Sequence, residues 1–152
     1  MEREDVDAHI AAMPGVVPKA AWGETSYFYN PGSRFERGTY FATLKDHDGA
    51  SDRASRLDRP GVWRLNIGVG KTTYLALFGS PPHRPGKGET IEGHWDFTAL
   101  DVLTPHPVYG WMSWVAVLNP SAETWARCID LLADAHKRAA ATFEQRVRAA
   151  QR

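Results

Sequence analysis

The residues best suited to chemistry gather in one segment, residues 93–114, which reads GHWDFTALDVLTPHPVYGWMSW. Imidazoles and carboxylates set among large amphipathic rings are typical of ligand pockets, where an apolar wall supplies contact area and a few polar groups fix orientation. The same residue types also build stable loops, with tryptophans in the core and aspartates capping turns. The residues concerned are His94, Trp95, Asp96, Asp101, His106, Tyr109, Trp111 and Trp114.

Metal-free acid–base chemistry is the reaction type that this segment favours. Histidine titrates near neutral pH, so His94 or His106 could act as a general base while Asp96 or Asp101 orients its ring and Tyr109 donates a proton. The catalytic candidates are therefore His94, Asp96, His106 and Tyr109, and the ligand-contacting candidates in the segment are Trp95, Asp101, Trp111 and Trp114.

A metal site is the alternative use of the same side chains. His94, Asp96 and His106 would supply two histidines and one carboxylate, a set that suits Fe(II) or Zn²⁺. His-x-Asp brings its two side chains to one face only where the backbone is extended, and nothing in the sequence fixes that. We therefore expect no metal and no cofactor. Motifs for a nucleophile such as G-x-S-x-G are absent, and Cys128 falls within a helical pattern beside Arg127.

The stretch NIGVGKTTYLALFG, residues 66–79, looks at first like a phosphate-binding loop. A Walker A motif needs its first glycine five positions before the second, so that backbone N–H groups surround the phosphates. Gly70, Lys71 and Thr72 fit the end of the motif, but the first position falls on Leu65, inside a predicted strand. The strand MSWVAVLN ends in Asn119 and not in the aspartate that would hold Mg²⁺. We expect no nucleotide at this turn.

A second polar cluster, SDRASRLDRPGVWRLN at residues 51–66, interleaves arginines with aspartates. Alternating charges usually form local ion pairs on a solvated loop. Arg64 differs because its strand position gives the guanidinium a fixed direction beside Asn66, where it could clamp a ligand carboxylate or phosphate. A salt bridge to a loop aspartate is the equally supported alternative. Arg64 and Asn66 complete the set of ligand-binding candidates.

The elements that must position these side chains follow from periodicity and punctuation. EDVDAHIAAMPG predicts an amphipathic helix, TSYFYNPG and RGTYFATLKDHDG a hairpin, and VWRLNIG a third strand with Trp63, Leu65 and Ile67 on one face. KTTYLALFG predicts a short helix, SPPHRPGKGE a loop, and MSWVAVLN the last strand. Asn119 and Pro120 are the expected start of a closing helix that runs without Gly or Pro over residues 121–152. The predicted order is α-β-β-β-α-β-α, an α+β fold.

Length and composition fit one domain spanning residues 1–152, with a hydrophobic fraction of 43%. Lys plus Arg and Asp plus Glu both number 18, so no global field attracts nucleic acid or an anionic membrane. The single cysteine excludes an internal disulfide and points to the cytoplasm. The acidic start MEREDVDAHIAAM resembles neither a signal peptide nor a membrane span, and we expect no membrane partner.

The closing helix leads us to expect a homodimer. At 1.5 Å per residue it would be about 45 Å long, against roughly 30 Å for a small domain. Its apolar stripe runs through Trp125, Ile129, Leu132 and Ala135, and residues 143 and 147 continue it as Phe and Val. Those two side chains would be exposed in a monomer, and a second copy would cover them. A solvated, frayed tail is the alternative.

Four stretches carry a family resemblance over nearly the whole chain: PGVVPKAAWGETSYFYNP, RGTYFATLKDHDG, DRPGVWRLNIGV and PHPVYGWMSWVAVLNP. Together they look like an actinobacterial family catalogued only as a domain of unknown function. In layout the chain also resembles the MmcQ/YjbR-like proteins, which share an LPGV-type start, here MPGV at residues 13–16, and are similar to a frataxin-like α+β sandwich. The resemblance implies a single domain, with an antiparallel sheet packed against an N-terminal helix and a long C-terminal helix from about residue 120. It supplies no established catalytic residues.

Three functions compete at this point. A DNA-binding role has been suggested for MmcQ/YjbR-like proteins, whose last strand is preceded by Lys and His beside a Trp; here the region reads PVYGWMSW, which argues against nucleic acid. We expect a cytoplasmic small-molecule-binding domain with its pocket between Arg64, Asn66 and the 94–111 loop. The alternatives are a metal-free hydrolase, lyase or isomerase in that pocket, and a nucleic-acid or protein interaction module.

Overall fold

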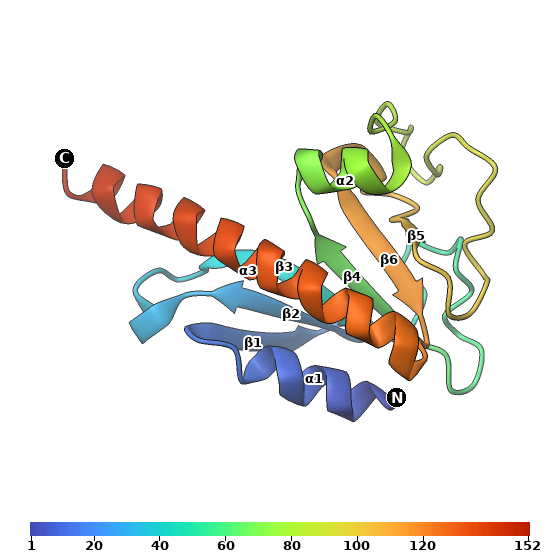
Figure 1. Ribbon diagram of the computed structural model, residues 1–152, viewed down its shortest axis with the longest axis horizontal. Helices are drawn as coiled ribbons and strands as arrows, with labels where there is room; N and C mark the ends of the chain where they lie inside the picture. The colour runs from blue at the N-terminus through green and yellow to red at the C-terminus, as the bar shows by residue number, and fades with distance from the viewer.

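The computed structural model describes residues 1–152, which build an α+β fold on one six-stranded sheet (Figure 1). The strand order is β1-β2-β3-β4-β6-β5, and every neighbouring pair is antiparallel. The predicted fold class is therefore confirmed. The strands are β1 (Val16–Ala21), β2 (Glu24–Tyr29), β3 (Thr39–Lys45), β4 (Arg64–Gly68), β5 (Thr104–Pro105) and β6 (Trp114–Leu118).

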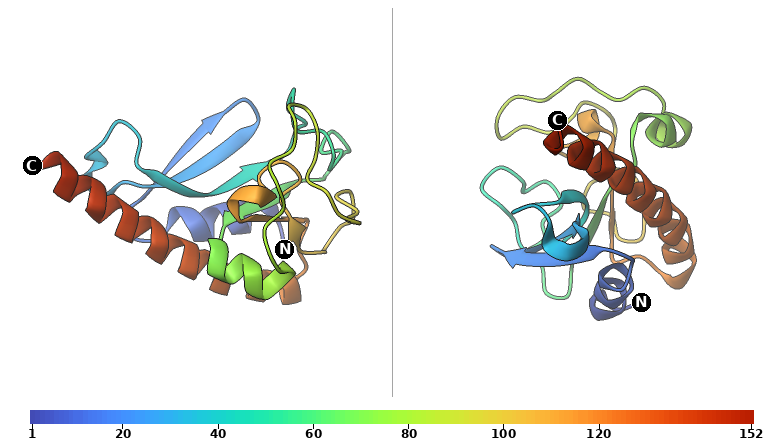
Figure 2. Two further views of the ribbon diagram at one scale, coloured as in Figure 1. Left: turned by 90° about the horizontal axis from the view of Figure 1, so that it is seen from above. Right: turned by 90° about the vertical axis from the view of Figure 1, so that its left-hand side faces the viewer.

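Three helices complete the fold: α1 (Arg3–Ala11), α2 (Lys71–Phe78) and α3 (Ala122–Ala150). Two short 3₁₀ turns, η1 (Pro31–Ser33) and η2 (Gly110–Met112), lie in the connections. Figure 2 shows α1 and α3 on one face of the sheet, while the long connection between β3 and β4 lies toward the other face. One face of the sheet is therefore covered by helices and the other in part by the β3–β4 connection.

The apolar core lies between the sheet and α3. Alternating residues of the central strands, among them Leu44, Leu65 and Val117, face Leu132 and other buried residues of the helix. Strand alternation sends the polar residues between them to the opposite face. The predicted division of the third strand is confirmed, because Trp63, Leu65 and Ile67 all belong to the core.

The start of α3 differs from the prediction. Ser121 is the N-cap, and its hydroxyl accepts a hydrogen bond from the backbone N–H of Thr124 at 3.3 Å. Asn119 instead has a positive φ of 42° and ties the end of β6 to the start of β4. Its side chain accepts from the N–H of Trp63 at 3.0 Å and donates to the carbonyl of Gly61 at 2.8 Å.

Two strands were not predicted, so the expected order of four strands is incomplete. Strand β1 lies at the sheet edge and contains Pro18, which has no N–H to donate and is tolerated in edge strands. Strand β5 has only two residues, Thr104 and Pro105, paired with Ala116 and Val115.

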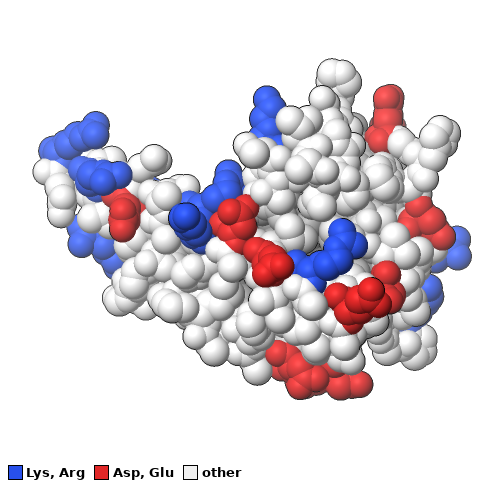
Figure 3. Space-filling model, in the orientation of Figure 1, with Lys and Arg blue, Asp and Glu red and all other residues white.

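The prediction that Phe143 would be exposed is wrong. Its side chain is 6% exposed, because the rings of Tyr29 and Phe35 pack against it edge-on, each with 5.3 Å between centroids. Val147 is half-buried in the next turn. The last turns of α3 project past the sheet, and blue Lys and Arg side chains gather there while red Asp and Glu side chains lie near α1 (Figure 3). The homodimer was expected because Phe143 and Val147 would be exposed in a monomer. Burial of Phe143 weakens that reason, and the homodimer stays a prediction.

Candidate functional site

A pocket of about 370 Å³ opens on the sheet face that points away from the core. Strands β2, β3, β4 and β6 form its floor, and residues 49–52 and the loop before η2 contribute its walls. We call it the sheet pocket. The residues on which its chemistry depends are Tyr40, Lys45, Asp52, His106, Tyr109 and Trp114.

The polar character of the pocket floor follows from strand register. Thr43 stands opposite Asn66 and Lys45 opposite Arg64, so alternation directs all four to the same face. Asn66 donates from its side-chain amide to the hydroxyl of Thr43 at 2.9 Å. The floor is therefore polar, with Asn66 hydrogen-bonded to Thr43 across β3 and β4 and to Arg64 along β4.

A β-bulge places an aromatic wall beside this floor. Tyr27 pairs with Ala42 and Phe28 with Tyr40, so Phe41 is an extra residue in β3. Phe41 and Ala42 both belong to the core, and Tyr40 turns to the pocket. There it stacks on Trp114, with centroids 5.1 Å apart and an interplanar angle of 29°.

Arg64 is fully buried beneath the pocket, and its guanidinium is held by several acceptors. Nη1 donates to Asp52 Oδ1 and Ser55 Oγ, each at 3.0 Å, Nη2 donates to Asp52 Oδ2, and Nε donates to Asn66 Oδ1 at 2.7 Å. Of the two interpretations of Arg64, the salt bridge to a loop aspartate is the one the structure has. The guanidinium organises the floor and is not itself part of the pocket lining.

Asp52 is the counter-charge of Arg64. Burial raises the pKa of its carboxyl, but the hydrogen bonds and positive charge of Arg64 outweigh burial, so the pKa lies below its usual range. Asp52 is therefore ionised at neutral pH, and the buried pair carries no net charge.

His106 lies against this pair and is 3% exposed. Its Nδ1 accepts hydrogen bonds from the backbone N–H groups of Val108 at 3.1 Å and Tyr109 at 3.0 Å. Its Nε2 lies 3.3 Å from Nη2 of Arg64. Burial, followed by the charge of Arg64, lowers the pKa of His106 well below its ordinary value. The imidazole is neutral at physiological pH.

The mouth of the pocket carries Lys45, Glu24 and Tyr109. Lys45 is half-buried and takes part in no ion pair, although Glu24 is its cross-strand neighbour. Tyr109 is 49% exposed, and the centroid of its ring lies 5.0 Å from that of His106. A cation and a phenol therefore stand at the opening without fixed partners.

The structure brings five of the sequence candidates together: Arg64, Asn66, His106, Tyr109 and Trp114. The remaining five lie outside the pocket lining. Asp96 accepts bonds from the N–H and hydroxyl of Thr98, and Asp101 accepts from the N–H of Ser121. Trp95 packs edge-on against Phe78, Trp111 lies under the guanidinium of Arg84, and His94 is exposed.

The metal set, Cys128 and the phosphate-loop-like turn, three features singled out in the sequence, each have a defined place in the structure. No three His, Cys, Asp or Glu side chains gather as they would around a metal ion, so His94, Asp96 and His106 do not form the proposed set. Burial raises the pKa of the Cys128 thiol to about 11. Gly68 ends β4 and Gly70 caps α2 with a φ of 86°, which confirms the turn expected at the phosphate-loop-like stretch.

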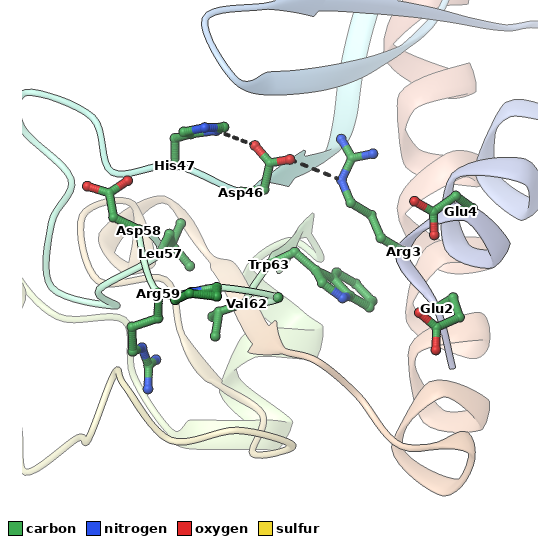
Figure 4. Close-up of a pocket in the computed structure, with 12 residues that line it drawn as sticks. Glu2, Arg3, Glu4, Asp46, His47, Leu57, Asp58, Arg59, Val62 and Trp63 are labelled. Carbon is green, nitrogen blue, oxygen red and sulfur yellow. Dashed lines mark hydrogen bonds and ion pairs between the residues drawn. The ribbon is translucent and has the colours of Figure 1, made fainter.

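Figure 4 shows a second hollow, of about 430 Å³, between the start of α1 and the segments around Asp46 and Arg59. Arg3 and Asp46 form an ion pair there at 3.7 Å, and Asp46 also contacts His47. The guanidinium of Arg59 is taken up by backbone carbonyls of its own loop and of Thr98. No ionisable residue of this hollow is buried, so its charges are ordinary surface charges.

A family model matches residues 1–148, and its description is a family of unknown function (DUF6194). The chain belongs to this family. No curated protein and no solved structure matches this DUF6194 chain. The actinobacterial origin and the relation to MmcQ/YjbR-like proteins accordingly stay predictions. The helices of this DUF6194 protein include none with the length and apolarity needed to span a bilayer.

Of the six residues on which the chemistry of the pocket depends in this DUF6194 protein, the sequence did not indicate three: Tyr40, Lys45 and Asp52. Lys45 had a usable signal, because Thr43 and Lys45 alternate with the apolar Ala42 and Leu44. Asp52 was one of two aspartates near Arg64, and only the fold distinguishes it. Tyr40 had no signal, because its direction depends on the bulge.

Proposed function

We propose that this protein binds a small molecule in the sheet pocket. The observation that carries the proposal is the buried polar floor: the Arg64–Asp52 pair, Asn66 and His106 lie next to a cavity with an aromatic wall. Burying charge is costly, and apolar residues of similar size would cover a sheet face with equal or greater stability. A rigid polar floor in a concave site is typical of ligand recognition.

Acid–base catalysis in the same pocket is the second candidate, because His106 has a strongly shifted pKa and Tyr109 beside it. A hydrolase, lyase or isomerase would use such a pair. The direction of the shift ranks this candidate second, since a histidine with a depressed pKa is a weak base. Its environment suits donation of a hydrogen bond better than abstraction of a proton.

A nucleic-acid or protein interaction module is the third candidate. Lys and Arg gather at the end of α3, but charges of both signs interleave along the rest of the face in Figure 3. The cytoplasmic location and the homodimer belong to this proposal as expectations. Sedimentation of the full chain at high micromolar concentration tests the dimer, which a monomer would exclude.

Binding is tested by titrating isotope-labelled protein with small flat compounds and following backbone amide signals. We expect shifts confined to β3 and to residues 49–52 and 106–109. Tyr109→Ala should weaken binding, whereas Leu100→Ala should not. Tyr109 and Leu100 are both 49% exposed, but Leu100 is outside the pocket. If no compound shifts these amides at millimolar concentration, the proposal is wrong.

A further inference from the structure

The hydrogen bonds around His106 determine which ring nitrogen carries its proton. Two backbone N–H groups donate to Nδ1, so a proton on Nδ1 would face two donors at 3.0 and 3.1 Å. A proton on Nε2 gives up only one longer contact, the 3.3 Å approach of Arg64 Nη2. A neutral imidazole has one donor and one acceptor nitrogen. The arrangement therefore favours the Nε2–H form.

This form leaves a buried donor without a protein acceptor. Within the chain, the one hydrogen-bond contact of Nε2 is with Arg64 Nη2, which is itself a donor. His106 is part of the pocket lining, and only 3% of its surface is exposed. Buried N–H groups almost always have an acceptor, and a buried N–H group without a hydrogen bond destabilises the protein. An oxygen atom from outside the chain is the acceptor this geometry lacks.

Lys45 supplies a second donor toward the same space. Its ammonium group lies in the pocket lining without an ion pair, and it is close enough to His106 to lower the pKa of that ring. The carboxylate of Asp52 is already occupied by Arg64, which leaves Glu24 at the rim as the unengaged acid of the lining. A half-buried lysine without a partner is suited to an anionic oxygen.

The stacked rings of Tyr40 and Trp114 form the remaining wall. Tyr40 is 48% exposed, so part of its ring is available for contact with a flat apolar group. Resting on the proposed binding function, we infer that the ligand is an anion in which a carboxylate or similar oxyanion is joined to a flat ring-like portion. The oxyanion accepts from His106 Nε2–H and pairs with Lys45, and the ring packs against Tyr40.

Matched carboxylates and amides test this inference: benzoate against benzamide, and indole-3-carboxylate against indole-3-carboxamide. Each is titrated into the labelled full-length protein at pH 7.5 and low salt. We expect each carboxylate to bind at least about tenfold more tightly than its amide, as a charge-assisted contact predicts. Lys45→Met should abolish the preference, Lys45→Arg should keep it, and Lys71→Met, an exposed lysine outside the pocket, should leave it unchanged.

The outcomes separate the inference from the proposed function. If carboxylate and amide bind the pocket equally, or the amide binds better, the inference is overturned while small-molecule binding stands. If neither compound of either pair shifts the pocket amides, both fail for flat ligands. Imidazole ¹⁵N spectra give an independent readout: His106 should show the Nε2–H form, and its Nε2 signal should shift with carboxylate but not with amide. A proton on Nδ1 would also overturn the inference.

Discussion

Replacing Asp52 by asparagine measures how far one loop carboxylate stabilises the buried guanidinium of Arg64. Both carboxylate oxygens accept bonds from Arg64, whose side chain is fully buried. Asparagine keeps the size but turns an NH₂ donor toward the guanidinium and removes its counter-charge. Breaking a buried ion pair by changing one partner costs about 3–5 kcal/mol. Because the Asp52 side chain is 14% exposed, water partly screens the pair and we expect about 3 kcal/mol.

Urea unfolding at pH 7 measures this loss. With a denaturant dependence of about 2 kcal/mol/M, the midpoint of Asp52→Asn should fall by about 1.5 M. Asp130→Asn is the matched control, because Asp130 is exposed on α3 and belongs to no ion pair. The double variant Asp52→Ala with Arg64→Met removes both charges and should be more stable than Asp52→Asn alone.

The pH dependence provides a further check with a definite sign. Because the folded pKa of Asp52 is lowered, its stabilisation is complete above the unfolded pKa of about 3.9 and is lost as pH falls through the folded value. The stability difference between the native protein and Asp52→Asn should therefore shrink below about pH 4. A cost under about 1 kcal/mol at pH 7, or a difference unchanged at pH 3, would refute the reasoning.

Three further predictions concern other parts of the molecule. Because the folded pKa of His106 is depressed, the native protein should lose stability as pH falls below about 6.5, by at most about 1.4 kcal/mol per pH unit. Unfolding of His106→Gln at pH 5.0 and 7.5 should show a flatter dependence, and parallel curves would contradict this. Phe143→Ala should lower the unfolding free energy by about 3 kcal/mol in urea, whereas a loss below about 1 would mean that the end of α3 is not packed. Calorimetry should find no Mg²⁺-dependent ATP binding at residues 70–72, and binding that disappears in Lys71→Ala would prove otherwise.

The four strands that the sequence predicts have at least five residues, some of them buried, whereas β1 has no buried residue and β5 has only two residues. In β4, Leu65 and Ile67 alternate with polar residues because one side of the strand meets the core. Strand β1 has no such signal, because Pro18 and Lys19 are exposed and the strand needs a partner on one side only. Its existence depends on the main chain of β2, which the pattern of β1 does not encode.

The pocket was only partly predictable for a related reason. Arg64 and Asn66 stand on a strand, so their common direction follows from a period of two residues. His94 and Asp96 were joined to His106 by nearness in sequence, but they lie in an irregular connection with no period. In such a segment the direction of each side chain is set by contacts such as that of Asp96 with Thr98.

The extra residue at Phe41 reverses the order in which the side chains of β3 alternate between the two faces of the sheet. Before it, Tyr40 belongs to the pocket; after it, Ala42 belongs to the core. A substitution at either position leaves this alternation intact. Deletion of one residue would instead exchange the core face and the pocket face for every side chain on one side of the deletion. Natural or engineered changes of length in β3 would therefore alter which ring faces the pocket without substituting any pocket residue.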